Sequence, residues 1–296
     1  MSWYDDDDTP RKQTEQIRYY RSFSEALDLA DNAPPSDASS SHATGSYYTR
    51  EWSGTDAWPE ALKLAREGWK EGAAKAMPMV NSITASVATR VVQETVITQD
   101  YPNSLGFSVP ALLSGTPDYW YAFNPQASDT RNSPQIKLSI SLCQSGGVPA
   151  KVMEMKGAAL AAIANALELS GKSVQIQADY TTSRNGSYIS DVIIIKDYGE
   201  PLDLTQIIFA IGHAASLRRI GFSMWEQSPQ AIRSQVGVQS FGGYGTPTDC
   251  KEESRGSIHI PSSYLYDGDV DWNNRGSVEK WISAKLESCG VTLAHQ

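Results

Sequence analysis

Apolar and polar residues alternate along several stretches in the second half of the chain. Every second residue of 135–142 is apolar, from Ile136 to Leu142, which predicts a strand with one apolar face. The stretches 174–181 and 188–196 also have strand composition, and Asn185-Gly186 between them favours a tight hairpin. The predicted strands of this half are 135–142, 174–181, 188–196 and 257–260.

Stretches with helical composition separate these strands. Residues 152–170 are rich in alanine, which has the highest helix propensity. Asp203 is suited to cap a helix over 204–225, and a last helix is expected over 278–288. Strands and helices that alternate in this order predict an α/β domain, with a mixed, mostly parallel sheet flanked by helices.

The first half of the chain has a different character. Residues 17–31 are expected to form a short helix, because Ser22 and Glu25 have the spacing of a capping box. Helical patterns follow from residue 50 to about residue 99, and a segment rich in Pro and Gly continues from there. These shifts predict three parts: a mobile N-terminal segment with a short helix and a Ser/Pro-rich linker (1–49), a helical and irregular covering segment (50–134), and the α/β domain (135–296).

Composition narrows the classes of function. The chain contains 25 Lys and Arg against 34 Asp and Glu, so its formal net charge is −9 (25 − 34). This charge disfavours general binding to the phosphate backbone of nucleic acids. No apolar run reaches the length of about 18 residues that a bilayer crossing needs, so no membrane contact is expected. Three distant cysteines, without a CxxC pair or a secretion signal, fit a reducing cytoplasm and argue against structural zinc.

Known catalytic and ligand-binding motifs do not occur in the sequence. Asp267–Asp271 alternates carboxylates as a calcium loop does, but the glycine and the glutamate that such a loop requires are missing. Gly146-Gly147 lacks the other residues of phosphate-binding loops. His213 lies in an apolar stretch, which is typical of a core histidine, and no GxSxG elbow is present. We therefore expect no enzyme, no catalytic residue and no cofactor, while a catalytic set assembled only in space stays open as an alternative.

A few large or charged side chains are candidates for contact with partners. Arg218 and Arg219 are adjacent, and with Lys196 they would form a small basic spot that, beside Trp120, suits a single nucleic-acid strand. Paired arginines at a helix end are more often explained by the helix dipole, so nucleic-acid binding is not favoured. Trp225 is a candidate anchor for a protein contact.

The order of strands and helices resembles that of von Willebrand factor A-type domains. The stretches IKLSISLCQSGG and MKGAALAAIANALELSGKSVQIQADY are similar to the first strand, helix and second strand of that family, especially of its cobalt-chelatase-like branch. The family holds a divalent metal in a turn of the form Asp-x-Ser-x-Ser, whose three positions fall on Ser141, Cys143 and Ser145. Only Ser145 matches and the carboxylate is missing, so the resemblance implies this fold with a degenerate metal site.

Four stretches also resemble uncharacterised proteins of tailed bacteriophages and related mobile elements. They are GTDAWPEALKLAREGW, VPALLSGTPDYW, MKGAALAAIANALELSG and PLDLTQIIFAIGHAASLRRIGFSMWE, within residues 50–226. This resemblance implies a viral or prophage origin and a place in the host cytoplasm or the virion. We expect a non-enzymatic protein that acts through protein–protein contacts, in a structural, assembly or adaptor role, with phage-encoded proteins or further copies of itself as partners. The alternative is a nucleic-acid-associated accessory protein of phage replication or transcription.

Overall fold

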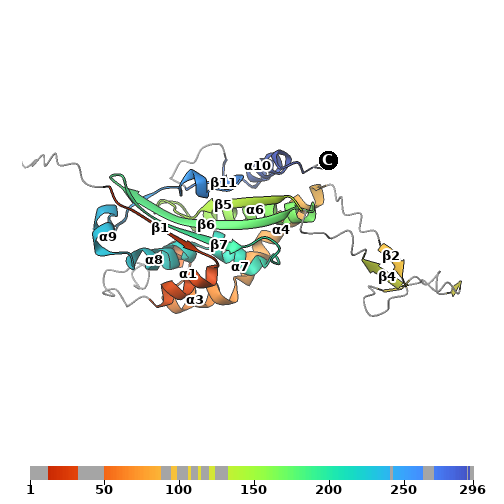
Figure 1. Ribbon diagram of the computed structural model, residues 1–296, viewed down its shortest axis with the longest axis horizontal. Helices are drawn as coiled ribbons and strands as arrows, with labels where there is room; N and C mark the ends of the chain where they lie inside the picture. Colours follow the sequence, from red (N-terminus) through yellow and green to blue (C-terminus); the bar gives the residue numbers. More distant parts are fainter. Residues whose placement is uncertain are drawn as a thin grey trace, which may run out of the picture.

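A computed structural model describes residues 13–32, 50–87, 95–98, 106–107, 113–114, 120–123, 133–240, 243–262, 270–291 and 293 (Figure 1). Helices and strands alternate along the second half of the chain, as the sequence predicts. In chain order the elements are β1 (Glu15–Tyr20), α1 (Phe23–Asp31), α2 (Arg50–Ser53), α3 (Trp58–Glu67), α4 (Lys70–Ser86), β2 (Thr95–Thr98), β3 (Gly106–Phe107), β4 (Trp120–Phe123), β5 (Gln135–Ser141), α6 (Ala150–Leu169), β6 (Ser173–Arg184), β7 (Ser187–Lys196), α7 (Leu204–Gly212), the π-helix η4 (Ser216–Gly221), α8 (Phe222–Glu226), α9 (Gln230–Val236), β8 (Val238–Ser240), β9 (Gly243–Tyr244), β10 (Thr246–Pro247), the 3-10 helix η5 (Glu252–Ser254), β11 (Ile258–Ile260) and α10 (Arg275–Ser288).

The main sheet confirms the predicted α/β class. Its strands lie in the order β1-β7-β6-β5-β11, and the short β10 pairs with β6 beside this path. β1 is parallel to β7, and β5 is parallel to both β6 and β11, whereas β6 and β7 are antiparallel. The antiparallel pair is the predicted hairpin, in which Asn185 and Gly186 have φ angles of 51° and 80°. The sheet is therefore mixed and mostly parallel.

Helices pack against one face of this sheet. α6 connects the parallel strands β5 and β6, and its alanines share one hydrophobic core with the apolar residues of both strands. α7 crosses α6 where two glycines meet: a Cβ added at Gly157 would lie 2.5 Å from the Cα of Gly212. α4 and α10 also contact α6. Figure 1 shows α1, α3, α7 and α8 together on one side of the sheet.

The opposite face of the sheet is polar and is crossed by residues 248–256, which we call the strap. Two side chains of the sheet, Lys137 Nζ and Gln177 Nε2, each donate a hydrogen bond of 2.7 Å to the carbonyl oxygen of Ser254. The main chain of the strap thereby provides an acceptor for the buried amide of Gln177 and for the half-buried ammonium group of Lys137. The strap also brings Asp249 and Cys250 against the sheet.

The predicted helix over 17–31 is wrong in its first part. Residues up to Tyr20 form the strand β1, and the helix α1 begins only after Ser22. The predicted cap is confirmed, because Ser22 Oγ accepts a hydrogen bond from the backbone N–H of Glu25. A capping box marks where a helix begins, and the residues before it are free to form a strand.

β1 is held in the sheet by a side chain whose partner lies far along the chain. Arg18 Nε and Nη2 donate to the two carboxylate oxygens of Asp191 on β7, at 2.5 and 2.8 Å. Asp191 is fully buried, so β1 covers a charged group that needs its arginine. Residues 13–32 thus belong to the α/β body, and the division expected at residue 49 does not hold for them.

The helix expected to continue to about residue 99 ends at Ser86. Residues 95–98 form β2 instead, in a three-stranded antiparallel sheet of order β2-β4-β3. The β-branched residues Val96 and Ile97 favour a strand over a helix. Figure 1 shows this small sheet to one side of the main body.

The helix expected over 204–225 is divided into three elements. Asp203 caps α7 as predicted, accepting hydrogen bonds from the N–H groups of Thr205 and Gln206. α7 then ends because His213 has an extended backbone (ψ 133°), and its Nδ1 accepts a hydrogen bond from the N–H of Ala215. The chain continues as η4 and α8.

Candidate functional site

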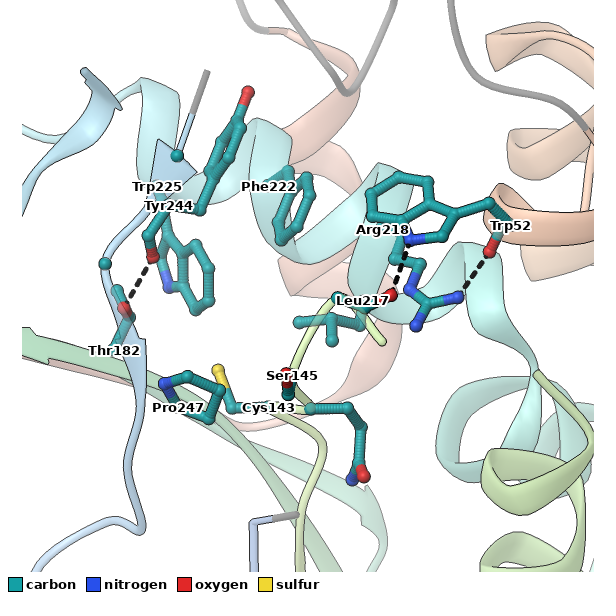
Figure 2. Close-up of a pocket in the computed structure, with 14 residues that line it drawn as sticks. Trp52, Cys143, Ser145, Thr182, Leu217, Arg218, Phe222, Trp225, Tyr244 and Pro247 are labelled. Carbon is teal, nitrogen blue, oxygen red and sulfur yellow. Dashed lines mark hydrogen bonds between the residues drawn. The ribbon is translucent and has the colours of Figure 1, made fainter. Parts of the chain in front are cut away.

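A cavity of about 420 Å³ lies at the carboxyl end of β5. Ligands of open α/β sheets commonly bind at this end of the strands. The loop after β5, the helices η4 and α8, α2, and residues 243–247 contribute its walls (Figure 2). We call it the edge cavity. It is lined by Trp52, Cys143, Gln144, Ser145, Gly146, Thr182, Leu217, Arg218, Phe222, Trp225, Gly243, Tyr244, Gly245 and Pro247.

Aromatic rings form one wall of the edge cavity. Phe222 and Tyr244 stack with 3.9 Å between ring centroids and 8° between ring planes. The centroid of Phe222 also lies 6.1 Å from that of Trp52 and 5.6 Å from that of Trp225. Figure 2 shows these rings on one side of the cavity and Cys143 on the other. The wall offers flat apolar surface to an apolar group.

Arg218 is the one charged side chain among the described residues that line this cavity, and it is only 1% exposed. Its Nη1 donates to the carbonyl oxygen of Trp52 at 2.6 Å, and its Nη2 donates to that of Val148 at 2.7 Å. The guanidinium carbon lies 4.6 Å from the centroid of the Trp52 ring. Burial lowers the pKa of Arg218 to about 10, so the group stays cationic at neutral pH.

The two adjacent arginines of the π-helix η4 point to different places. Ser216 Oγ donates to the carbonyl oxygen of Ala210 at 2.7 Å where this helix begins. Arg218 lines the edge cavity, whereas Nη2 of Arg219 donates to the carbonyl oxygen of Thr55 at 3.1 Å. π-helical turns are rare and occur frequently at functional sites.

The basic spot predicted on the surface is not formed by the residues proposed for it. Arg219 is 0% exposed and Lys196 is 2% exposed, and Lys196 pairs with a carboxylate of α6 at 2.6 Å. Arg218 is equally buried, because η4 lies inside the body and its two arginines bind groups of the protein itself. Trp120 begins β4 in the small sheet, whereas Trp225 lines the edge cavity.

The three positions of the degenerate metal turn do not converge. Cys143 and Ser145 line the edge cavity, but Ser141 Oγ donates to Asp179 Oδ2 at 2.6 Å. Thr181 Oγ1 donates to the other oxygen of Asp179, also at 2.6 Å. Burial raises the pKa of Asp179, although these hydrogen bonds oppose the shift. In the part of the chain that the structure describes, no group of three or more His, Cys, Asp or Glu side chains is arranged to hold a metal ion.

A Ser–His–Asp arrangement does occur, on the polar face of the sheet under the strap. Ser139 Oγ is hydrogen-bonded to His259 Nδ1 at 2.8 Å, and His259 Nε2 lies 3.5 Å from Asp249 Oδ2. Ser139 is 0% exposed, and its Oγ also accepts a hydrogen bond from the N–H of Gly256. A nucleophile must touch its substrate, so this set holds the strap in place and does not form a hydrolase site.

Sequence patterns alone do not bring the aromatic wall together. Phe222 and Tyr244 meet only because α8 and residues 243–247 lie side by side in the fold. One local signal points to this loop: Gly245 has a φ angle of 75°, and a Cβ there would lie 2.3 Å from Thr182 Oγ1. Only glycine allows this close approach. The glycine marks a loop that packs tightly, but it does not reveal what the loop faces.

Within the described residues, no helix combines the length and the apolar character that a bilayer crossing demands. No curated protein and no solved structure shows significant similarity to the chain. A family model described as a domain of unknown function, DUF7192, matches residues 8–288. Because this match spans β1 to α10, the chain belongs to the DUF7192 family.

Proposed function

We propose that the protein is a non-enzymatic, bacteriophage-type module related to von Willebrand factor A domains, and that it binds another protein at the edge cavity. The observation that carries the proposal is the composition of this cavity, where an aromatic wall lies beside a buried cation. Aromatic residues and arginine are the side chains most enriched at the centres of protein interfaces.

The position of the cavity supports the relationship. Cys143 and Ser145, two positions of the turn that resembles the metal-binding turn of that family, line it. The order of β5, α6, β6 and β7 is the one that suggested the resemblance. A protein-binding surface at this edge of the sheet would lie where that family binds its metal ion, but it would bind its partner without a metal.

Burial of catalytic groups favours a binding role over an enzymatic one. The nucleophile of the Ser–His–Asp arrangement, Ser139, is inaccessible under the strap. Burial also raises the pKa of Cys143 well above its ordinary value, so its thiol is a poor nucleophile. The alternative of nucleic-acid binding rested on a basic surface formed by Arg218, Arg219 and Lys196. These three side chains are buried, so they do not form such a surface.

Crosslinking in cells that carry the gene tests this function. Lys151 is exposed in the first turn of α6, five residues after Gly146 of the cavity rim in the sequence, and its amine is a suitable crosslinking point. We expect Lys151 of the tagged full chain to crosslink to one partner protein. Gly146→Leu should abolish this crosslink, because a Cβ at Gly146 meets no atom within 4 Å and the added side chain would occupy the cavity rim without disturbing the fold.

Gly276→Leu is the matched control, since Gly276 is exposed on α10 and a Cβ there has only one neighbour, at 3.4 Å. This variant should retain the crosslink. A partner that Gly146→Leu retains would exclude the edge cavity as the contact. Crosslinks to nucleic acid in place of protein would favour the accessory role in replication or transcription.

A further inference from the structure

We infer that the edge cavity receives the C-terminal residue of a partner chain, with an apolar last side chain against the aromatic wall and the terminal carboxylate on Arg218. This inference rests on the proposed function and specifies which part of the partner enters. It follows from the charge, the depth and the lining of the cavity.

The one charged side chain among the described residues that line the cavity is a cation, which favours an anionic ligand. The guanidinium of Arg218 borders the cavity, where it contacts two carbonyl oxygens and the Trp52 ring. No carboxylate of the described residues pairs with it. Glu226, the last residue of α8, does not line the cavity and accepts a hydrogen bond from the hydroxyl of Tyr244. α6 begins just after the cavity loop, with no acidic residue in its first turn. Its N-terminal dipole adds positive potential to that of Arg218.

A carboxylate fits this setting better than a phosphate group does. A phosphate would bring close to two negative charges into a cavity with one cation and an aromatic wall, so its loss of hydration would be costly. The chain also carries a net charge of −9, which repels a dianion more strongly than a monoanion. One carboxylate matches the single cation, and arginine binds this group with charge-assisted hydrogen bonds.

The depth of the cation favours a chain terminus over an acidic side chain. Because Arg218 is 1% exposed, a ligand must enter the cavity to reach it. The last residue of a chain can insert with its side chain and its carboxylate together, whereas an Asp or Glu side chain on a folded surface projects only a few atoms. A volume of about 420 Å³ lies in the usual range for sites that enclose small ligands.

Gln144 provides the third contact that a terminal residue needs. Its side chain is 8% exposed, Nε2 donates to the carbonyl oxygen of Ser141 at 3.4 Å, and Oε1 has no partner among the described residues. A buried acceptor without a partner costs stability, which a ligand donor would recover. The backbone N–H of a terminal residue, next to its carboxylate, is such a donor.

Matched peptide pairs test the inference on the full chain. The probes are short fluorescein-labelled peptides that end in Val, Leu, Met, Phe or Trp, each made as the free acid and as the C-terminal amide. Fluorescence anisotropy should show that at least one acid binds at least about tenfold more tightly than its amide, the range expected for a hydrogen bond to a buried cation. Gly146→Leu should abolish binding of that acid, and Gly276→Leu should retain it.

Arg218→Gln identifies the cation directly. It should remove the difference between acid and amide while leaving the weaker binding of the amide. Because loss of Arg218 can disturb the fold, the comparison of acid with amide on the unaltered protein decides the question by itself. If every acid and its amide bind alike, or if no acid binds, the inference is wrong. The proposed function would still stand in either case if Gly146→Leu removes the crosslinked partner.

Discussion

Two buried bases, Arg218 and His213, lie close together in the sequence but differ in charge. Arg218 starts from so high a pKa that burial, which lowers it to about 10, leaves the cation in place. His213 starts from 6.5, and burial lowers its pKa to about 4. Its ring packs 5.0 Å from that of Phe209 and edge-on at 4.5 Å from that of Trp69, as expected for a core histidine. At neutral pH the first group can attract an anion, and the second acts as a neutral hydrogen-bond acceptor.

The neutral state of His213 predicts how stability depends on pH. Between pH 6.5 and pH 4 the unfolded chain binds a proton at this residue and the folded protein does not, so acidification favours unfolding. The full difference corresponds to about 3 kcal/mol of unfolding free energy lost by pH 4. His213→Asn keeps an acceptor for the N–H of Ala215 but cannot titrate. In urea unfolding series the variant should lose about 3 kcal/mol less than the unaltered protein between pH 7 and pH 4.

The unfolding free energies of the two proteins at neutral pH cannot be compared directly, because the substitution itself changes packing against Trp69. The test is how steeply the unfolding free energy of each protein falls as the pH is lowered. Equal slopes for both proteins over this range would contradict a neutral, buried His213.

Sequence reasoning found several residues of the edge cavity but not the cavity itself. Arg218 and Trp225 were predicted as surface contacts, and Cys143 and Ser145 as remnants of a metal turn. Residue type and spacing cannot show that α7 stops at His213 and that Arg218 of η4 points inward. Burial depends on what packs over a side chain, and here that cover includes α2, which lies far away in the sequence.

At the scale of elements, the crossing of α6 and α7 depends on two glycines that are not equivalent. A Cβ at Gly157 would lie 2.5 Å from the Cα of Gly212, whereas a Cβ at Gly212 would lie 3.3 Å from the Cα of Gly157. The first distance forces the helix backbones apart, and the second requires a shift of only a few tenths of an ångström. Both glycines lie in helices, where alanine is intrinsically favoured by about 1 kcal/mol.

Gly157→Ala should therefore destabilise the protein by about 1–3 kcal/mol, the usual cost of overpacking, while Gly212→Ala should be close to neutral. Urea unfolding of the two single variants measures both values, and each variant serves as the control for the other. Equal losses would show that the two helices do not cross as closely as described.

Sequence patterns predict a helix, strand or turn well where the residues of that element determine its structure without contacts from elsewhere in the chain. The hairpin at Asn185-Gly186, the alanine-rich α6 and the cap at Asp203 all follow from local rules. β1 does not, because its partner strand β7 lies far along the chain, where Arg18 of β1 meets Asp191. A short strand at the edge of a sheet has no strong local signature, so the sequence pattern does not separate β1 from the helix α1 that follows it.

At the scale of the whole molecule, segments that differ in composition along the sequence pack together into one folded body. Trp52 of α2 forms a wall of the edge cavity and donates through Nε1 to the carbonyl oxygen of Gly146 at 3.1 Å. Lys251 of the strap pairs with Glu15 of β1 at 2.8 Å. The predicted α/β domain of 135–296 therefore depends on segments before it in the chain. This dependence means that the described body should unfold as a single cooperative unit.

Arg18→Met tests this unity, because it removes the ion pair that binds β1 to the sheet. Burial raises the pKa of Asp191, a shift that Arg18 opposes, so loss of Arg18 leaves a buried carboxyl group without its cation. We expect a loss of about 3–5 kcal/mol in the unfolding free energy of the entire body. Tryptophan emission during urea unfolding reports this loss, since every tryptophan except Trp3 follows residue 49.

The double variant Arg18→Met with Asp191→Leu separates the charge effect from the loss of β1. Replacing both partners of a buried ion pair by apolar groups is often neutral, so the double variant should regain most of the stability that the single variant loses. If β1 and α1 formed a separate N-terminal segment, Arg18→Met would leave the tryptophan transition at its original midpoint. If the urea midpoint shifts while the unfolding curve keeps a single transition, the N-terminal strand belongs to the same folding unit as the edge cavity.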